Sequence, residues 1–330
     1  MYPALVGLAF VLAFVPTFAL MPSLIKGLRK HRHLLRPDMN KQNHPLVPSF
    51  GGIGVVTGFL FALTSVILVD RLLGWNQINL GLLLPALLST ALCALLGLVD
   101  DLLEIPRRFM KPLLVLYASI PVMALTQLNP VVGLPLLGNL DLGVAYYLFF
   151  IPCAIVFCSN AVNILSTYNG LETGLGLIAL SALALVAFLQ GSVLGLLFAV
   201  PLIAVLLAFY HFNRFPSKIF LGNMGTLFIG AAIAITGIIG KMEAALVVVM
   251  VPYFAHFLLY SRNLYRWKPN MWGIPLKNGF LKPRYSKPYG LMHWLLNKKR
   301  LTERQVVYFV FAVEAVFAAA AVALEWLGKA

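Results

Sequence analysis

The feature that most constrains the fold is a series of apolar runs, each close to the length of a helix that crosses a lipid bilayer. Such a helix needs about 20 mainly apolar residues, because the hydrocarbon core is about 30 Å thick. We count ten runs, at Pro3–Ile25, Phe50–Val69, Gly81–Val99, Pro112–Leu125, Val144–Leu165, Gly174–Leu189, Ser192–His211, Ile219–Gly240, Met242–Tyr260 and Gln305–Leu327. Charged residues make up 11% of the chain, whereas soluble domains carry roughly 25%. The sequence therefore predicts one all-α, polytopic integral membrane domain over residues 1–330, with about ten transmembrane helices.

Lysine and arginine are distributed unevenly between the loops that join these runs. Of the 25 basic residues, 22 lie in loops that face one side, and only Arg71, Lys241 and Lys329 lie on the other. The positive-inside rule places the richer side in the cytoplasm and both termini outside. The expected cytoplasmic loops are approximately 26–49, 100–111, 166–173, 212–218 and 261–304. The net charge of +14 then reflects topology and anionic lipid rather than a nucleic-acid partner. We expect a multi-pass protein of the cell membrane or an ER-type membrane, with its active site facing the cytoplasm.

Two adjacent carboxylates, Asp100 and Asp101, close the third run, and Arg107, Arg108 and Lys111 follow them. Side-by-side carboxylates repel each other unless a cation or another partner is present. A hard divalent cation suits them, since Mg²⁺ is usually held by one or two carboxylates together with substrate phosphates. The alternative is a solvated helix end that balances the neighbouring arginines, and the residues alone leave both interpretations open.

Two amides share one helical face at the end of the fifth run. Asn160 and Asn163 are three residues apart, and a polar turn, Asn169–Glu172, follows them. Amides at membrane depth are unfavourable unless they have partners or line a wet cavity. Hydrogen bonding between helices would explain a single asparagine. Two on one face favour a site, so Asn160 is a candidate substrate-binding residue.

The eighth run begins with glycines around a polar residue, Gly222–Gly225. Glycine lets the backbone approach a ligand closely, and the first turn of a helix offers amide groups to phosphate. The alternative is close packing of spans through small residues.

Four segments, taken in order, carry a family resemblance. They are Asp38–Lys41 with Pro48–Gly52, Gly97–Asp101, Asn160–Leu165 through Asn169–Gly174, and Pro216–Asn223. Together they resemble the polyprenyl-phosphate N-acetylhexosamine-1-phosphate transferase family, and most closely its eukaryotic and archaeal UDP-GlcNAc:dolichyl-phosphate GlcNAc-1-phosphotransferase branch. The bacterial phospho-MurNAc-pentapeptide translocase is a related member. The resemblance extends over essentially the whole chain.

The resemblance implies a Mg²⁺-dependent transfer, with Mn²⁺ as a substitute. A phosphate oxygen of a polyprenyl or dolichyl phosphate attacks the β-phosphorus of a UDP-sugar, and a lipid diphosphate-sugar and UMP are formed. The partners implied are the UDP-sugar, with UDP-GlcNAc as the expected donor, the lipid acceptor, the membrane, and a second copy in a homodimer. A different UDP-amino sugar of the cell-wall type is the alternative donor. A lipid-linked substrate transporter is a further alternative, although such proteins keep polar residues near the midplane and show internal repeats.

The resemblance also implies residue roles on the nucleotide side. Asn163 would be a metal ligand, Asn169 would hold the uracil edge, and Phe220 would stack on the uracil.

On the lipid-phosphate side, Asp100 and Asp101 would serve the metal and the acceptor phosphate, with Asp101 also a metal ligand. Which of the two acts as a base stays open. Lys111 would reach a phosphate, and Lys41 is a second candidate for that task.

Two departures from the family pattern affect these expectations. The usual metal-binding aspartate of the fourth segment is Asn223 here, whose carbonyl oxygen can still ligate a hard cation but brings no charge. Glu172, assigned to substrate binding, is also the candidate acid that would compensate. The stretch Asn270–Pro275 lacks the basic residues that relatives use for sugar recognition, so the donor sugar is undetermined by sequence. Asn223 also raises the alternative of a catalytically weak family member.

Overall fold

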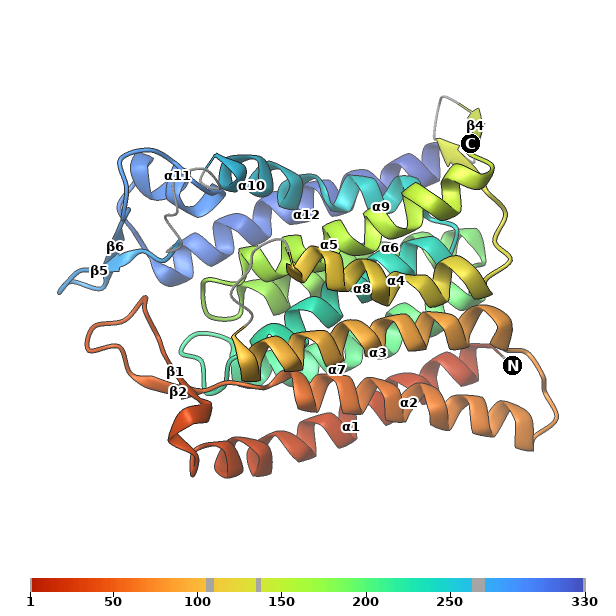
Figure 1. Ribbon diagram of the computed structural model, residues 1–330, viewed down its shortest axis with the longest axis horizontal. Coiled ribbons are helices and arrows are strands. Elements are labelled where there is room, and N and C mark those ends of the chain that lie inside the picture. The colour runs from red at the N-terminus through yellow and green to blue at the C-terminus, as the bar shows by residue number, and fades with distance from the viewer. Residues whose placement is uncertain (1, 105–109, 135–137, 263–270, 329–330) are drawn as a thin grey trace.

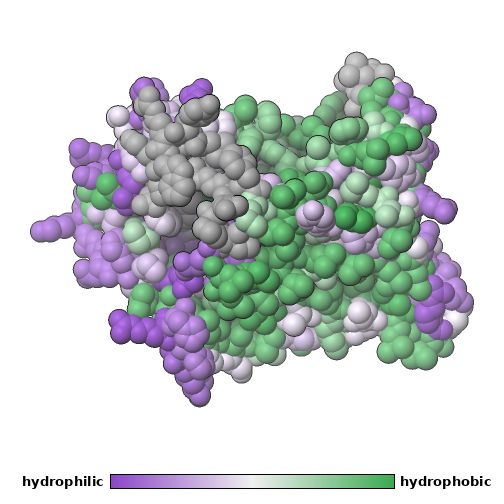
Figure 2. All heavy atoms as spheres, viewed as in Figure 1, coloured by the Kyte–Doolittle hydropathy of each residue, from purple (hydrophilic) through white to green (hydrophobic). Residues whose placement is uncertain are grey.

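The computed structural model describes residues 2–104, 110–134, 138–262 and 271–328, and its long helices lie roughly side by side (Figure 1). Hydrophobic side chains cover the middle of the visible face, and hydrophilic ones gather at the two ends (Figure 2). This banded surface is typical of a protein whose central zone contacts lipid. The prediction of a polytopic membrane protein is therefore confirmed.

Each predicted apolar run coincides with a helix or a pair of helices. The long helices are α1 (Tyr2–Leu28), α2 (Gly52–Leu72), α3 (Leu80–Leu103), α5 (Ile151–Leu165, preceded by a π-helical turn at Tyr146–Phe150), α6 (Leu171–Gln190), α7 (Val193–Asn213), α8 (Gly222–Ile239) and α12 (Glu303–Leu327). These eight are long and apolar enough to cross a membrane.

The two remaining apolar runs form helices that are bent or short, so the number of spans in the structure differs from the ten runs in the sequence. Helices α9 (Glu243–Val249) and α10 (Val251–Ser261) are bent by 52° at their junction, and the described chain has up to nine spans if this pair crosses once. Helix α4 (Met110–Leu125) has 16 residues and is about 24 Å long at 1.5 Å per residue, shorter than the hydrocarbon core. Ten spans remains a prediction.

Short strands lie outside the bundle and qualify the all-α expectation. Three small antiparallel sheets occur in the loops, formed by β1 (Leu35–Pro37) with β2 (Leu46–Pro48), β3 (Val131–Leu134) with β4 (Gly138–Asp141), and β5 (Ile274–Pro275) with β6 (Phe280–Lys282) and β7 (Leu301–Thr302). A short helix, α11 (Leu291–Lys298), completes the last large loop. The fold is thus mostly helical, and strands occur where the backbone leaves the apolar zone.

The two ends of the bundle differ in content. Helix α1 begins and helix α12 ends at the end that carries β4, whereas β1, β2, β5, β6 and α11 lie at the opposite end (Figure 1). We call this second end the basic end, because the loops rich in lysine and arginine meet there. The extracytoplasmic placement of both termini remains a prediction.

Helix α8 occupies the centre of the bundle. Every residue from Met224 to Ile239 is buried, and α8 packs against α2, α3, α5 and α7. Glycines make two of these contacts very close. A Cβ added at Gly97 of α3 would lie 2.3 Å from the Asn223 carbonyl oxygen, and one at Gly230 of α8 would lie 2.3 Å from that of Cys158 in α5. Helices α3, α5 and α8 therefore touch backbone to backbone.

Replacing Gly230 by alanine should separate α5 from α8, because the added methyl group meets backbone rather than a side chain that can move. We expect Gly230→Ala to destabilise the protein by roughly 1–3 kcal/mol, as overpacked cores do. The measurement is the midpoint of thermal unfolding in detergent micelles. Gly7→Ala is the matched control, since nothing lies within 4 Å of its added Cβ. Equal midpoints for the two variants would contradict the close contact.

Candidate active site

A cavity of about 480 Å³ lies at the basic end, where α3, α5, α6 and α8 meet the β1–β2 loop. Its lining comes from segments far apart in the sequence, and most of the lining residues carry polar side chains. The lining residues are Arg36, Pro37, Asp38, Met39, Asn40, Ser49, Asp101, Asn163, Ser166, Thr167, Tyr168, Asn169, Glu172, Phe220, Leu221, Gly222, Asn223, Thr226 and Trp272. We call it the site cavity.

Asp101 holds the first turn of α8 against the end of α3. Its two carboxylate oxygens accept hydrogen bonds from the backbone amides of Asn223 at 2.9 Å and Met224 at 3.0 Å. Amides in the first turn of a helix have no partner within that helix, so a carboxylate from another helix satisfies them here. Gly222 permits this approach, because its φ is +78° and a Cβ there would lie 2.7 Å from the Asp101 carboxylate.

The Asn223 side chain connects the aspartate pair to α5. Its amide nitrogen donates to Asp100 Oδ2 at 2.7 Å, and its oxygen accepts from Asn163 Nδ2 at 2.7 Å. Because a carboxylate can only accept hydrogen bonds, the amide nitrogen must face Asp100. Lys111 Nζ lies 2.5 Å from the same Asp100 oxygen, and Asn163 Nδ2 also donates to Thr226 at 2.8 Å. One network thus joins α3, α4, α5 and α8.

A second network surrounds Asn169, in the turn between α5 and α6. Lys41 Nζ forms an ion pair with Asp38 and donates to Asn169 Oδ1 at 3.0 Å. Asn169 Nδ2 donates to Asp38 Oδ2 at 3.1 Å. The Asn169 backbone amide donates to Glu303 Oε1 at 2.9 Å, and that glutamate lies 3.5 Å from Lys41 Nζ. The network ties the first loop and α12 to this turn.

The turn also contributes Tyr168, whose side chain is 3% exposed. Burial raises the pKa of its phenol above the ordinary value. The hydroxyl therefore stays protonated at neutral pH, and its oxygen is buried without a hydrogen-bond partner in the described structure.

The structure brings most of the predicted site residues together in one place. Those that line the site cavity are Asp101, Asn163, Asn169, Glu172, Phe220 and Asn223. Phe220 is positioned by backbone pairing, since its amide donates to the Pro48 carbonyl and its carbonyl accepts from Gly51.

Four predicted residues lie outside this lining. Asp100 is 2% exposed and contacts Asn223 of the cavity lining, and Lys111 forms an ion pair with Asp100. Lys41 contacts Asp38 and Asn169, which line the cavity, but is not part of the lining itself. Asn160 donates to the Val156 carbonyl one turn back along α5 at 2.8 Å. Their assigned roles stay predictions.

Some residues that the sequence analysis named lie outside the described part of the chain. Arg107 and Arg108, which follow the aspartate pair, are among them, and so is Asn270 of the stretch without basic residues.

Asp38 and Glu303 are site residues that the sequence reasoning did not assign. Both are buried, at 2% and 4% exposed, and both contact Asn169 or Lys41 through carboxylate oxygens. A signal for Glu303 was present, because Thr302 and Gln305 form a capping box at the start of α12. That signal marks the helix start, but it does not reveal the contact with Asn169.

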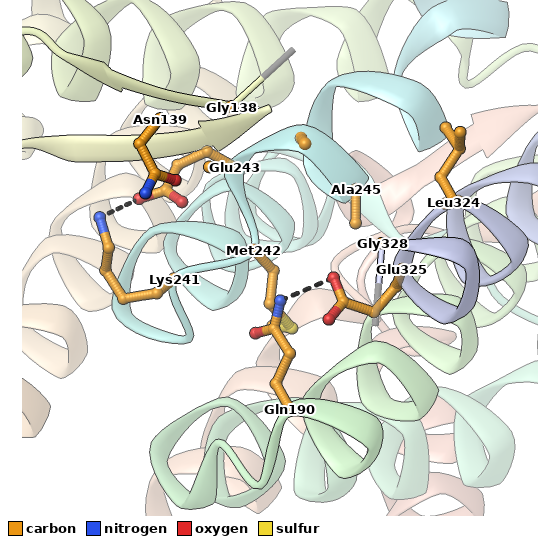
Figure 3. A pocket seen from close by; sticks show the side chains of 13 residues that line it. Gly138, Asn139, Gln190, Lys241, Met242, Glu243, Ala245, Leu324, Glu325 and Gly328 are labelled. Carbon is orange, nitrogen blue, oxygen red and sulfur yellow. Dashed lines mark hydrogen bonds and ion pairs between the residues drawn. The ribbon is translucent and has the colours of Figure 1, made fainter. Parts of the chain in front are cut away.

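A smaller cavity of about 350 Å³ lies at the opposite end, between the β3–β4 hairpin, α9 and α12. Its charged groups have partners: Lys241 Nζ lies 2.6 Å from Glu243 Oε1, and Gln190 donates to Glu325 at 2.9 Å (Figure 3). Lys241 also donates to the carbonyls of Asn129 and Val131. This lysine anchors the hairpin, and none of the predicted site residues reaches this cavity.

Comparison with known proteins identifies the family of the chain. The profile of glycosyl transferase family 4 matches residues 83–241, which include α3, α5, α6 and α8. A protein of Saccharolobus solfataricus named "Putative UDP-N-acetylglucosamine–dolichyl-phosphate N-acetylglucosaminephosphotransferase" is 35% identical over 96% of both chains. A protein of the same name from Sulfolobus acidocaldarius is 32% identical over 96% of this chain and 95% of its own. The phospho-N-acetylmuramoyl-pentapeptide-transferase of Limosilactobacillus fermentum is 32% identical over 75% of this chain and 78% of its own. The chain therefore belongs to the polyprenyl-phosphate N-acetylhexosamine-1-phosphate transferases of glycosyl transferase family 4, and it is an enzyme of that transferase type.

Proposed function

We propose that the protein transfers N-acetylglucosamine 1-phosphate from UDP-GlcNAc to dolichyl phosphate or another polyprenyl phosphate, with Mg²⁺, and releases UMP. The observation that carries the proposal is the meeting of Asp101, Asn163 and Asn223 in one polar cavity at the end of an apolar bundle. The names of the relatives that match over nearly the whole chain support the donor and the acceptor. A site at the edge of the apolar band suits a reaction between a water-soluble nucleotide and a lipid phosphate. The loops around it carry most of the basic residues, which supports a cytoplasmic orientation.

The hydrogen bonds of Asn169 restrict how it can recognise a uracil. A carboxamide offers two lone pairs and two N–H groups. Both lone pairs are used, by Lys41 Nζ at 3.0 Å and by the Ser217 amide at 2.7 Å, and one N–H is given to Asp38. The remaining N–H suits a uracil carbonyl oxygen. Phe220, on the cavity wall, supplies a face for stacking.

The oxygen groups in the cavity fit a magnesium ion. Asp101 and Asn163 both line it, and the Asn163 carboxamide oxygen accepts no hydrogen bond from the described residues. Glu172 is 4% exposed, and its Oε2 has no hydrogen-bond partner within the described ranges. Hard oxygen ligands of this kind are the ones that Mg²⁺ prefers. Asp101, Asn163 and Glu172 would therefore hold the ion, which when bound neutralises charge on the donor diphosphate.

The protein's own groups then position the two phosphates. Lys111 forms an ion pair with Asp100, and Asn223, which lines the cavity, donates a hydrogen bond to Asp100. A transfer of this type depends mainly on positioning and charge neutralisation. The acceptor phosphate oxygen forms the new bond to the β-phosphorus, and the bond to the bridging oxygen breaks, so that the electron pair leaves with UMP. The polar groups lie at one end rather than at the midplane, which disfavours a transporter.

The direct test is an assay with purified protein, radiolabelled UDP-GlcNAc, dolichyl phosphate and Mg²⁺. We expect labelled lipid and UMP in equal amounts, no product with EDTA, and recovery with Mg²⁺ or Mn²⁺. Mass spectrometry of the lipid product across a panel of UDP-amino sugars identifies the donor. Absence of product with every donor would refute the proposal.

Asn163→Ala should lower turnover by about 100-fold or more, because it removes both a cavity oxygen and the hydrogen bond that orients Asn223. The measurement is kcat in the same assay. Asn297→Ala, which removes an exposed amide on α11, is the matched control and should keep normal turnover. If Asn163→Ala works as well as the control, Asn163 is not a site residue.

Asn223→Asp tests the departure from the family pattern. Without metal, a carboxylate at 223 loses its hydrogen bond to Asp100 and repels it. We therefore expect a lower midpoint of thermal unfolding in EDTA and a larger rise on adding Mg²⁺ than in the native protein. The Mg²⁺ concentration for half-maximal activity should fall about tenfold, since an added charged ligand strengthens binding. Asn297→Asp controls for added charge. An unchanged Mg²⁺ requirement would show that asparagine at 223 is simply tolerated.

A further inference from the structure

A second cavity at the basic end shares Asn169 with the site cavity. It has a volume of about 540 Å³ and is formed by the end of α7, the loop before α8 and the start of α12. Its lining residues are Asn169, Tyr210, His211, Arg214, Phe215, Pro216, Lys218, Arg304, Val307 and Tyr308. We call it the basic pocket.

Three cations gather in the basic pocket without acidic partners. Arg214, Lys218 and Arg304 form no ion pair with any carboxylate in the part of the chain that the structure describes. The Arg304 guanidinium lies 4.7 Å from the centre of the Phe215 ring, which holds it at the pocket wall. Like charges close together are unfavourable unless an anion joins them. The pocket thus has the charge that binds phosphate.

An apolar groove continues from the basic pocket along the same two helices. It has a volume of about 870 Å³ and lies over α6, between α7 and α12. On α7, Leu207 of the groove is one turn before Tyr210 of the pocket. On α12, the groove runs from Ala315 to Leu327, two turns beyond Tyr308. From Tyr308 to Leu327 the helix rises about 28 Å at 1.5 Å per residue, enough for a hydrocarbon chain to lie along it.

We propose that this face binds an anionic phospholipid, with the headgroup phosphate among Arg214, Lys218 and Arg304 and the acyl chains in the groove over α6. Charge complementarity and the order of the two cavities support this occupant, because a cationic end followed by an apolar channel matches a phospholipid from headgroup to tail. Tyr210 lies in the last turn of α7 and Tyr308 near the start of α12, and tyrosine is enriched at membrane–water boundaries. A second copy of the chain fits less well, since a two-fold contact here would bring two sets of unpaired cations into one interface.

The phospholipid site is separate from the transfer reaction. None of its three cations lines the site cavity. Phospholipid binding can therefore be measured without enzyme turnover. Asn169 lines both cavities, so the headgroup lies next to the turn that carries the proposed uracil contact.

The test is native mass spectrometry of the purified protein in neutral detergent with phosphatidylglycerol, phosphatidylcholine or inorganic phosphate. We expect phosphatidylglycerol to be retained in preference to phosphatidylcholine. The double variant Arg214→Gln/Lys218→Gln should weaken its retention at least about tenfold, since each basic residue contributes measurably to binding an anionic lipid. The control Lys298→Gln/Lys299→Gln removes two exposed charges at the same end and should retain the lipid normally.

A separate variant tests whether acyl chains bind in the groove. Ala319→Phe fills part of it, so it should weaken long-chain phosphatidylglycerol more than the dihexanoyl form, and leave inorganic phosphate unaffected. Equal retention by the Arg214→Gln/Lys218→Gln variant and its control would overturn the site. Preferential retention of polyprenyl phosphate would show that the occupant is the acceptor lipid instead. A disulfide-linked dimer of Ala319→Cys that excludes phosphatidylglycerol would show that a second copy covers the groove.

Discussion

The position of the first turn of α8 determines the geometry of the site. Asp101, at the end of α3, accepts two backbone amides of that turn, and this bond is possible because Gly222 leaves room for the carboxylate. Gly97 and Gly230 then hold α3 and α5 against α8 at backbone contact. With three helices joined this closely, a small displacement of any of them would move the cavity wall. The polar groups can therefore be preorganised on rigid elements at the edge of an apolar bundle.

Asn223 belongs to the same first turn of α8, and its side chain bonds to both α3 and α5. Its amide faces a carboxylate on one side and another amide on the other, a combination that an aspartate could not form without a cation. The Asn223 amide connects Asp100 and Asn163 by hydrogen bonds alone. The departure from the family pattern is thus compatible with an ordered site.

The sequence predicts the parts of the structure that depend on local pattern. Apolar length located every long helix, because lipid imposes that length, and the family resemblance selected six residues that line one cavity. Other contacts depend on tertiary structure. Asn160 and Asn163 share a helical face, yet only Asn163 lines the cavity, since its amide donates to α8 whereas that of Asn160 donates to the Val156 carbonyl within α5. Glu303 lies 134 residues from Asn169, so no spacing rule connects them.

The acidic groups at the basic end indicate where a cation would be held. Asp38 and Glu303 contact Lys41, Asp100 contacts Lys111, and Asp101 binds helix amides. Glu172 differs, because its buried Oε2 has neither a hydrogen-bond partner nor an ion pair in the described structure, whereas the buried Oε2 of Glu303 lies 3.5 Å from Lys41 Nζ. A buried carboxylate oxygen in that state is unfavourable unless the group is neutral or a cation joins it. Glu172 lines the same cavity as Asn163 and Asn223, so it can restore the negative charge that is absent at position 223. In the proposed magnesium site, the negative charge would then come from the first turn of α6 rather than from that of α8.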